Sequence, residues 1–234
     1  MTVLSLITGV GSKGQVGESV AAALAGPGDT VLLVSRVEAE VRARAADLVA
    51  EGRRAHGYAC DLADARAVDQ LAVRIRSEHG DRLDALVNLA GGFGVSGPLA
   101  DSDPAVFDRQ LKINLTTAYL STRAFLPLLR PARGAVLFFA SEAVLEGART
   151  GGTAAYAAAK AAVVALMRSV ADEGRDYGVR SNALAPAAIR TAANQESMGA
   201  DARYVEREEV ASAVAFLCSP ASIAITGQVI RLRK

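Results

Sequence analysis

The sequence contains few of the residues that metal centres and disulfide frameworks require. Its 234 residues include two cysteines, two histidines and no tryptophan. Cys60 and Cys218 lie far apart, and neither has a histidine or cysteine neighbour at the spacing of metal ligands. His56 and His79 do not form a ligand pair either. We therefore expect two reduced thiols and no bound metal.

The sequence also lacks an excess of charge of one sign and any long hydrophobic run near its start. Lysine and arginine total 26 against 25 aspartates and glutamates, which gives no electrostatic reason to expect nucleic acid or an acidic membrane as a partner. The first residues carry no basic segment, and their apolar run is too short for a signal peptide or a membrane span. These absences predict a cytoplasmic protein.

What the sequence does have is a hydrophobic fraction of 51%, enough for a large core, and a regular alternation of two kinds of segment. No repeat, linker or break in composition divides the chain, so we expect a single domain over residues 1–234. Short apolar, β-branched runs predict strands at 3–8, 30–35, 54–59, 85–89, 135–140, 179–184 and 228–232. Helical patterns between them cover 18–25, 38–51, 65–78, 104–129, 153–177 and 208–218.

This alternation predicts an α/β fold built on a doubly wound, parallel sheet of seven strands. Residues 32–34 and 136–139 are continuously apolar, which is typical of strands buried on both faces of a sheet. Doubly wound sheets bind their ligands beyond the carboxyl ends of the strands. The functional residues are therefore expected directly after each strand.

A glycine-rich turn follows the first predicted strand and precedes the first predicted helix. It holds Gly9, Gly11, Gly14 and Gly17. Glycine lets the backbone approach a ligand closely, and the next helix offers free N–H groups to a pyrophosphate. Ordinary turns also contain glycines, but the strand–turn–helix context favours a dinucleotide site. The turn is not a P-loop, because no Gly-Lys-Ser/Thr occurs at the required place.

The residues after the second predicted strand indicate which dinucleotide binds. An acid there would accept hydrogen bonds from the adenosine ribose and favour NAD(H), whereas an arginine accommodates a 2′-phosphate. Arg36 follows Ser35, and no acid occurs before Glu38. Lys13 adds a second positive charge from the glycine turn. This pattern favours NADP(H) over NAD(H); the alternative for each cation is an ordinary surface residue.

Tyr156 and Lys160 lie four residues apart in an alanine-rich helical pattern and therefore share one helix face. A nearby ammonium, with the charge of an oxidised nicotinamide, would lower the pKa of a tyrosine from its usual value of about 10. Such a tyrosine can exchange a proton with a carbonyl or an alcohol. This spacing alone is common by chance. Ser141 after the fifth strand, and Asn114 in a helical pattern that asparagine fits poorly, strengthen the chemical interpretation.

In this order the residues resemble the short-chain dehydrogenase/reductase family over nearly the whole chain, in the single-domain form of 3-oxoacyl-carrier-protein reductases. The motifs are Thr8-Gly9…Gly14…Gly17, Asp61, Asn88-Leu89-Ala90-Gly91, Asn114, Ser141, Tyr156-x-x-x-Lys160 and the segment from Asn182 through Pro186 to Thr191. The resemblance implies a Rossmann-type fold with strand order 3-2-1-4-5-6-7.

The resemblance also implies a role for each motif residue. Tyr156 would be the general acid/base, Ser141 its partner on the substrate oxygen, and Lys160 the holder of the nicotinamide ribose. Asn114 would anchor a water in the proton relay. The implied cofactor contacts are Gly9, Gly11, Ser12, Lys13, Gly14, Val16, Gly17, Arg36, Asp61, Leu62, Asn88, Ala90, Gly91, Tyr156, Lys160, Pro186, Ile189 and Thr191.

The sequence departs from the family pattern at several places. The glycine turn is longer than usual, and Ser141 precedes Tyr156 by more positions than is common, so Glu142 competes for the place of the serine. We favour Ser141, with a longer loop after it. The segment at about 191–206 is short and polar and is expected to be a substrate lid over an open site. The family resemblance also implies a homodimer or homotetramer, formed through the long fourth and fifth helices.

The sequence therefore predicts an oxidoreductase that transfers a hydride between NADP(H) and a small carbonyl compound or secondary alcohol. One alternative is a nucleotide-binding sensor or scaffold on the same fold that has lost its chemistry. The intact Tyr156–Lys160 pair speaks against that alternative. A second alternative, a reductase of C=C or imine bonds, stays open.

Overall fold

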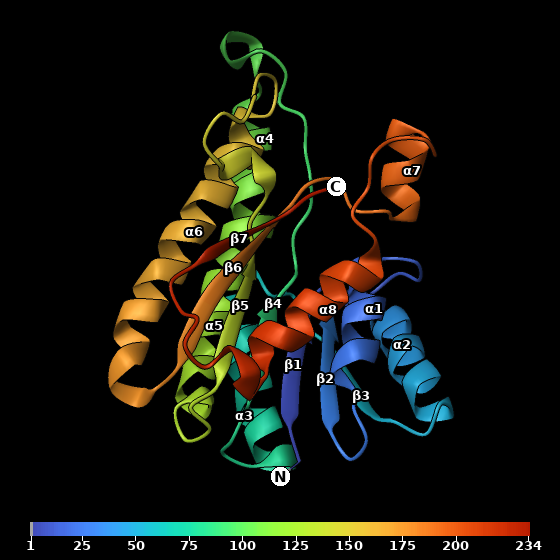
Figure 1. Ribbon diagram of the computed structural model, residues 1–234, viewed down its shortest axis with the longest axis vertical. Coiled ribbons are helices and arrows are strands. Elements are labelled where there is room, and N and C mark those ends of the chain that lie inside the picture. Colours follow the sequence, from blue (N-terminus) through green and yellow to red (C-terminus); the bar gives the residue numbers. More distant parts are fainter. Residues whose placement is uncertain (1) are drawn as a thin grey trace.

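The computed structural model describes residues 2–234, which form a seven-stranded parallel sheet between two layers of helices (Figure 1). The sheet order is β3-β2-β1-β4-β5-β6-β7, and every neighbouring pair is parallel. The predicted doubly wound fold and its strand order are therefore confirmed. The strands are β1 (Leu4–Thr8), β2 (Thr30–Ser35), β3 (Arg54–Ala59), β4 (Ala85–Asn88), β5 (Ala135–Phe139), β6 (Arg180–Pro186) and β7 (Val229–Leu232).

Two groups of helices cover the two faces of the sheet. In Figure 1 the helices α1, α2 and α8 lie in front of the sheet, while α3, α5 and α6 lie on the other side. The helices are α1 (Val16–Leu24), α2 (Glu38–Ala50), α3 (Ala65–His79), α4 (Pro104–Leu111), α5 (Thr117–Leu129), α6 (Ala154–Gly174), α7 (Ala192–Met198) and α8 (Arg207–Cys218). Because both faces are covered, the strands are apolar almost throughout, as the sequence indicates. The short helix α7 was not predicted.

The prediction of one continuous helix over 104–129 is wrong in its middle. A π-helical turn at Lys112–Thr116 separates α4 from α5. The buried Asn114 lies inside this turn, and its side-chain amide donates to the carbonyl oxygens of Gly92 at 3.0 Å and Gln110 at 3.2 Å. These bonds compete with the regular helical pattern, which is the reason that asparagine is a poor residue for a helix interior.

Helix α6 and the turn after it, Ala154–Tyr177, have the length and composition of a segment that could cross a membrane, with a mean hydropathy of 1.3. In this fold the helix packs against β5 and β6 instead. Val163, Met167 and Val170 from α6 are buried in the core between the helices and the sheet. Its apolar character is therefore explained by its place as a core helix.

The carboxyl ends of β1 and β4 are joined by the side chain of Thr8. Its hydroxyl oxygen accepts the backbone N–H groups of Leu89 and Ala90, each at 3.1 Å. This threonine holds the glycine turn after β1 against the chain that leaves β4. The residues predicted to be functional are thus brought to one edge of the sheet.

Candidate active site

A cleft of about 750 Å³ opens at the carboxyl ends of β1, β2, β3 and β4. It is bounded by the glycine turn, the first turn of α2, the residues after β3 and β4, and the π-turn before α5. The predicted cofactor residues that line it are Gly9, Gly11, Ser12, Val16, Gly17, Arg36, Asp61, Leu62, Ala90 and Gly91. Most of the predicted adenosine and pyrophosphate contacts therefore share one cavity.

Three predicted cofactor residues near this end lie outside the lining of the cleft. Lys13 is exposed at the tip of the glycine turn, and Gly14 lies beside it. Asn88 is buried below the cleft, where its amide nitrogen donates to the Thr122 hydroxyl at 2.9 Å. Its amide oxygen is buried without a hydrogen-bond partner. Asn88 is therefore placed to support the floor of the cleft rather than to line it.

Three charged residues that the sequence analysis did not select do line the cleft: Glu40 from α2, Arg109 from α4 and Lys112 from the π-turn. Arg109 and Lys112 are three residues apart and so lie on one helix face. Each is followed in the sequence by a residue, Gln110 or Ile113, whose side chain lies close to the loop after β4. The three-residue spacing of Arg109 and Lys112 was the only sequence signal for these cleft residues. Spacing alone does not show which face of a helix meets the cleft.

The glycine turn needs glycine at Gly9 and Gly17 for reasons of space. Gly9 has a φ of +78°, and a Cβ there would lie 2.8 Å from the backbone of Ala90. A Cβ on Gly17 would lie 3.1 Å from the carbonyl oxygen of Gly9. The turn, α1 and the chain after β4 therefore pack backbone against backbone. Glycine is therefore needed at both positions for packing within the protein. Gly9, Gly11 and Gly17 also line the cleft, where a dinucleotide pyrophosphate would fit their backbone.

Tyr156 lies in the first turn of α6, at the end of β5. Its ring meets the edge of the Phe93 ring with a centroid separation of 5.1 Å. Burial raises the pKa of the Tyr156 phenol, and a hydrogen bond with Ser141 acts in the opposite direction. The lowered pKa expected from the sequence includes the charge of an oxidised nicotinamide, and it stays a prediction for the complex. In the protein alone, the loss of water around the phenol outweighs the contact with Ser141.

Lys160 lies one helical turn after Tyr156 and is only 6% exposed. Its ammonium group donates to the carbonyl oxygen of Phe139 at 2.7 Å and lies 5.9 Å from the centre of the Tyr156 ring. Burial lowers the pKa of Lys160 to about 8. The ammonium is therefore fixed at the end of β5, with its charge weakly solvated.

The side chains of Asn114 and Lys160 both approach the space that a side chain on Gly91 would occupy. A Cβ on Gly91 would lie 2.5 Å from the side-chain oxygen of Asn114 and 3.4 Å from the Lys160 nitrogen. The same Asn114 oxygen accepts the N–H of Gly92 at 3.1 Å. The π-turn, the loop after β4 and α6 therefore converge at this glycine. The four predicted catalytic residues, Asn114, Ser141, Tyr156 and Lys160, are not part of the cleft lining. Asn114 and Lys160 nevertheless lie next to Gly91, which does line it.

The two candidates for the serine position have different surroundings. The Ser141 hydroxyl accepts the N–H of Ala143 at 3.2 Å and acts to lower the pKa of the Tyr156 phenol. The Glu142 carboxylate instead pairs with Arg231 of β7 and, at 3.3 Å, with Arg233. Ser141 therefore faces the tyrosine, whereas Glu142 ties the loop after β5 to the carboxyl-terminal strand.

The segment after β6 holds the remaining predicted residues. Pro186 ends β6, Ile189 bridges to Val205, and the Thr191 hydroxyl caps α7 by accepting the N–H of Asn194 at 3.2 Å. These three residues lie on the β6 side of the sheet edge, outside the lining of the adenosine cleft. Their contact with a nicotinamide stays a prediction.

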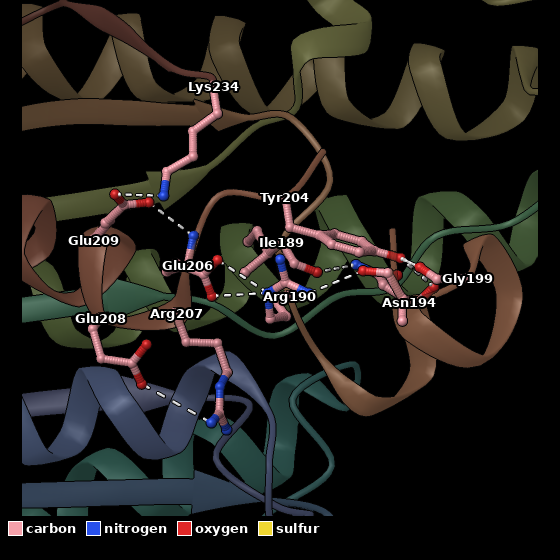
Figure 2. A network of polar contacts seen from close by, with 11 residues as sticks. Ile189, Arg190, Asn194, Gly199, Tyr204, Glu206, Arg207, Glu208, Glu209 and Lys234 are labelled. Atoms are coloured by element: carbon pink, nitrogen blue, oxygen red, sulfur yellow. Dashed lines mark hydrogen bonds and ion pairs between the residues drawn. The ribbon is translucent and has the colours of Figure 1, made fainter. Parts of the chain in front are cut away.

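The predicted lid at 191–206 is a short helix tied to the body of the protein (Figure 2). The buried Tyr204 hydroxyl lies 2.6 Å from the carbonyl oxygen of Gly199, at the end of α7. Arg190 pairs with Glu206 at 3.0 Å and stacks over the Tyr204 ring. Both ends of the segment are therefore anchored at one point, next to the start of α8.

Among residues 2–234 the structure contains no group of three acidic, histidine or cysteine side chains placed to hold a metal ion. Both cysteines are unpaired. Burial raises the pKa of Cys60 to about 11 and that of Cys218 to about 12. Neither thiol is placed for nucleophilic chemistry.

Comparison with known proteins agrees with this geometry. A family model described as enoyl-(acyl carrier protein) reductase matches residues 9–232. A 3-oxoacyl-(acyl-carrier-protein) reductase of Synechocystis sp. is 34% identical over 237 residues, which cover 96% of this chain and 93% of that protein. The chain belongs to the short-chain dehydrogenase/reductase family and is an oxidoreductase of the NAD(P)-binding type.

Solved structures of related enzymes contain both dinucleotides. A gluconate 5-dehydrogenase from Burkholderia cenocepacia, in complex with NADP and tartrate, has a TM-score of 0.90 at 26% identity, covering 99% of this chain and 93% of its own. An NAD⁺-bound xylitol dehydrogenase has a TM-score of 0.88 at 25% identity, covering 99% of this chain and 97% of its own. The fold is thus shared by enzymes that bind either cofactor.

Proposed function

We propose that this protein interconverts a carbonyl compound and a secondary alcohol, with NADP(H) as the hydride carrier and Tyr156 as the general acid/base. The observation that carries the proposal is the meeting of Ser141, Tyr156 and Lys160 at the end of β5, beside a dinucleotide-sized cleft. When bound, the nicotinamide supplies or accepts the hydride. The residues of this chain bind the two reactants and move the proton.

Tyr156 is the group proposed to donate a proton to a carbonyl oxygen. At neutral pH the phenol is protonated, and its hydroxyl is the proton donor of the site. The Ser141 hydroxyl, which contacts Tyr156, is the second donor toward the same oxygen. A carbonyl oxygen that accepts hydrogen bonds from both hydroxyls would be polarised and held in one orientation.

Lys160 and Asn114 support this step from below. The Lys160 ammonium is held by the Phe139 carbonyl and is positioned to bond a ribose hydroxyl and to stabilise negative charge that develops on Tyr156. Asn114 fixes the Gly91–Gly92 backbone beside the ammonium. We assign Asn114 a place next to the route by which water returns a proton to Tyr156.

The walls next to Tyr156 favour an apolar substrate. Phe93 is 67% exposed although its ring meets Tyr156, and Val95 in the same loop is 64% exposed. Val144 follows Ser141 on the other side and packs against the core. A ketone or aldehyde with a hydrophobic substituent fits these surroundings.

The test of the proposal begins with titration of the purified protein with NADPH and NADH, followed by nicotinamide fluorescence. We expect saturable binding of NADPH that is tighter than binding of NADH, and then oxidation of NADPH by members of a panel of apolar ketones and aldehydes. Binding of neither dinucleotide would reject the proposed enzyme. Binding without turnover on any carbonyl would favour the reduction of C=C or imine bonds.

Arg36→Asp should move the cofactor preference toward NADH. Arg36 lines the cleft directly after β2, and none of the ion pairs among residues 2–234 includes it. Loss of a charge-assisted contact with a 2′-phosphate should weaken NADPH binding by about 10- to 100-fold. Arg54→Asp is the matched control, because Arg54 begins β3 and lies outside the cleft lining. It should leave the ratio of the NADH to the NADPH dissociation constant unchanged. An unchanged ratio for Arg36→Asp would mean that another group reads the phosphate.

Ser141→Ala and Glu142→Gln should separate the two candidates for the serine position. Ser141→Ala removes a donor to the substrate oxygen and should lower kcat by about 100-fold. Glu142→Gln keeps the side-chain volume and loses only ion pairs with Arg231 and Arg233, and it should change kcat by less than about threefold. Steady-state kinetics on one ketone measures both. The reverse order of effects would assign the catalytic position to Glu142.

A further inference from the structure

An unexpected carboxylate lies at the adenosine end of the cofactor cleft. Glu40, on the first turns of α2, faces the glycine turn, and each of its carboxylate oxygens lies 3.4 Å from the Ser12 hydroxyl. A Cβ on Gly11 would lie 2.8 Å from the nearer of these oxygens and 3.0 Å from the Ser35 hydroxyl. Glu40 therefore stands next to the end of β2, where the cofactor ribose is expected.

In the described part of the chain, Glu40 has the Ser12 hydroxyl as a neighbour but no ion-pair partner. Glu38, the acid nearest to β2 in sequence, instead pairs with Arg42 at 2.6 Å on the exposed side of the same helix. Arg36, which lines the same cleft, is in none of the ion pairs of residues 2–234 either. One carboxylate and one guanidinium thus face the same region.

These two charges have opposite effects on the two cofactors. A phosphate on the 2′ oxygen carries close to two negative charges at neutral pH, so a guanidinium attracts it and a nearby carboxylate repels it. A ribose with a free 2′ hydroxyl can donate a hydrogen bond to the carboxylate, as acids at the end of the second strand do in NAD-binding folds. Here the acid comes from the helix after that strand.

We propose that Glu40 is a specificity-determining residue that accepts a ribose hydroxyl and opposes a 2′-phosphate, so that the protein uses both NADP(H) and NAD(H). This inference rests on the proposed dinucleotide-dependent function. It places Arg36 and Glu40 in competition. Arg36 alone would give a strong preference for NADP(H). The charge of Glu40 reduces this preference, because it weakens NADP(H) binding and favours NAD(H).

The test compares Glu40→Gln with the wild-type protein in titrations with NADPH and NADH. Glutamine keeps the length of the side chain and its contact with Ser12 but removes the charge. The ratio of the NADH to the NADPH dissociation constant should rise by about tenfold. At high ionic strength the difference between variant and wild type should shrink, because salt screens partly exposed charges. Glu40→Lys should move the ratio further in the same direction.

Glu38→Gln is the matched control, because it removes a carboxylate from the same helix outside the cleft lining and should leave the ratio unchanged. The inference would be overturned by an unchanged ratio in Glu40→Gln, or by an equal shift for both cofactors. Either result leaves the proposed function intact, provided that the wild-type protein binds a dinucleotide. Failure of the wild-type protein to bind either one would instead reject the proposed function, and this inference with it.

Discussion

Tyr156→Phe should lower kcat by about 100- to 10,000-fold while leaving the affinity for NADPH unchanged. The substitution removes one oxygen and keeps the ring that meets Phe93 at 5.1 Å. A tyrosine is normally protonated at neutral pH, and burial raises the pKa of this phenol further, so the substitution removes the proposed proton donor of carbonyl reduction. Binding of the dinucleotide depends mainly on the cleft residues after β1 to β4. Single-turnover kinetics and fluorescence titration measure the two effects separately.

Tyr177→Phe is the matched control for this prediction. Tyr177 follows α6 at its other end, is 45% exposed and lies under the Arg130 guanidinium. Its loss of a hydroxyl should change neither kcat nor the NADPH dissociation constant beyond about twofold, the usual range for an exposed position. Turnover in Tyr156→Phe that stays within tenfold of wild type would show that another group donates the proton. The role assigned to Tyr156 would then be rejected.

Gly9→Ala should destabilise the protein and weaken cofactor binding together. The positive φ of Gly9 costs an alanine about 1 kcal/mol or more. The added Cβ also meets the Ala90 backbone at 2.8 Å, and that backbone is held by Thr8. We expect a loss of about 3 kcal/mol in the free energy of unfolding, in the range of strained and overpacked sites. Urea denaturation measures the loss, and NADPH titration should reveal affinity lowered by at least tenfold.

Gly28→Ala isolates the cause of this loss. Gly28 has a φ of +84°, close to that of Gly9, but a Cβ there meets no atom within 4 Å. It should therefore cost only the backbone term of about 1 kcal/mol and leave NADPH binding unchanged. Equal losses of stability in the two variants would mean that the contact with Ala90 is not what requires glycine at position 9.

The fold could be predicted from the sequence because its signals are local. Continuous apolar runs such as 32–34 and 136–139 mark strands buried on both faces, and the alternation with helical segments implies parallel crossovers. The glycine turn, Arg36 and Asp61 were found because parallel strands place the residues after them at one edge. The structure puts all three at the same cleft. Short motifs and strand ends carried this information without any knowledge of distant contacts.

Other features depend on which elements meet, and these only the tertiary structure decided. Glu40 faces the cleft because α2 packs with that side toward the glycine turn. Glu142 is held away from the serine position because β7 brings Arg231 to it, from the far end of the chain.

The direction of the Tyr156 pKa shift has the same origin. The sequence identified a phenol next to an ammonium, and it predicts a lowered pKa when an oxidised nicotinamide adds its charge. The fold buries both groups, and the lost hydration of the phenol outweighs the favourable contact. The sequence by itself determined the positions of the strands and the residues at their ends, since these follow from local patterns. The order of the strands followed only from the family resemblance, and the strand pairing in the structure shows it. The charges and protonation of the site were decided by packing, because solvation depends on all the elements that surround a group.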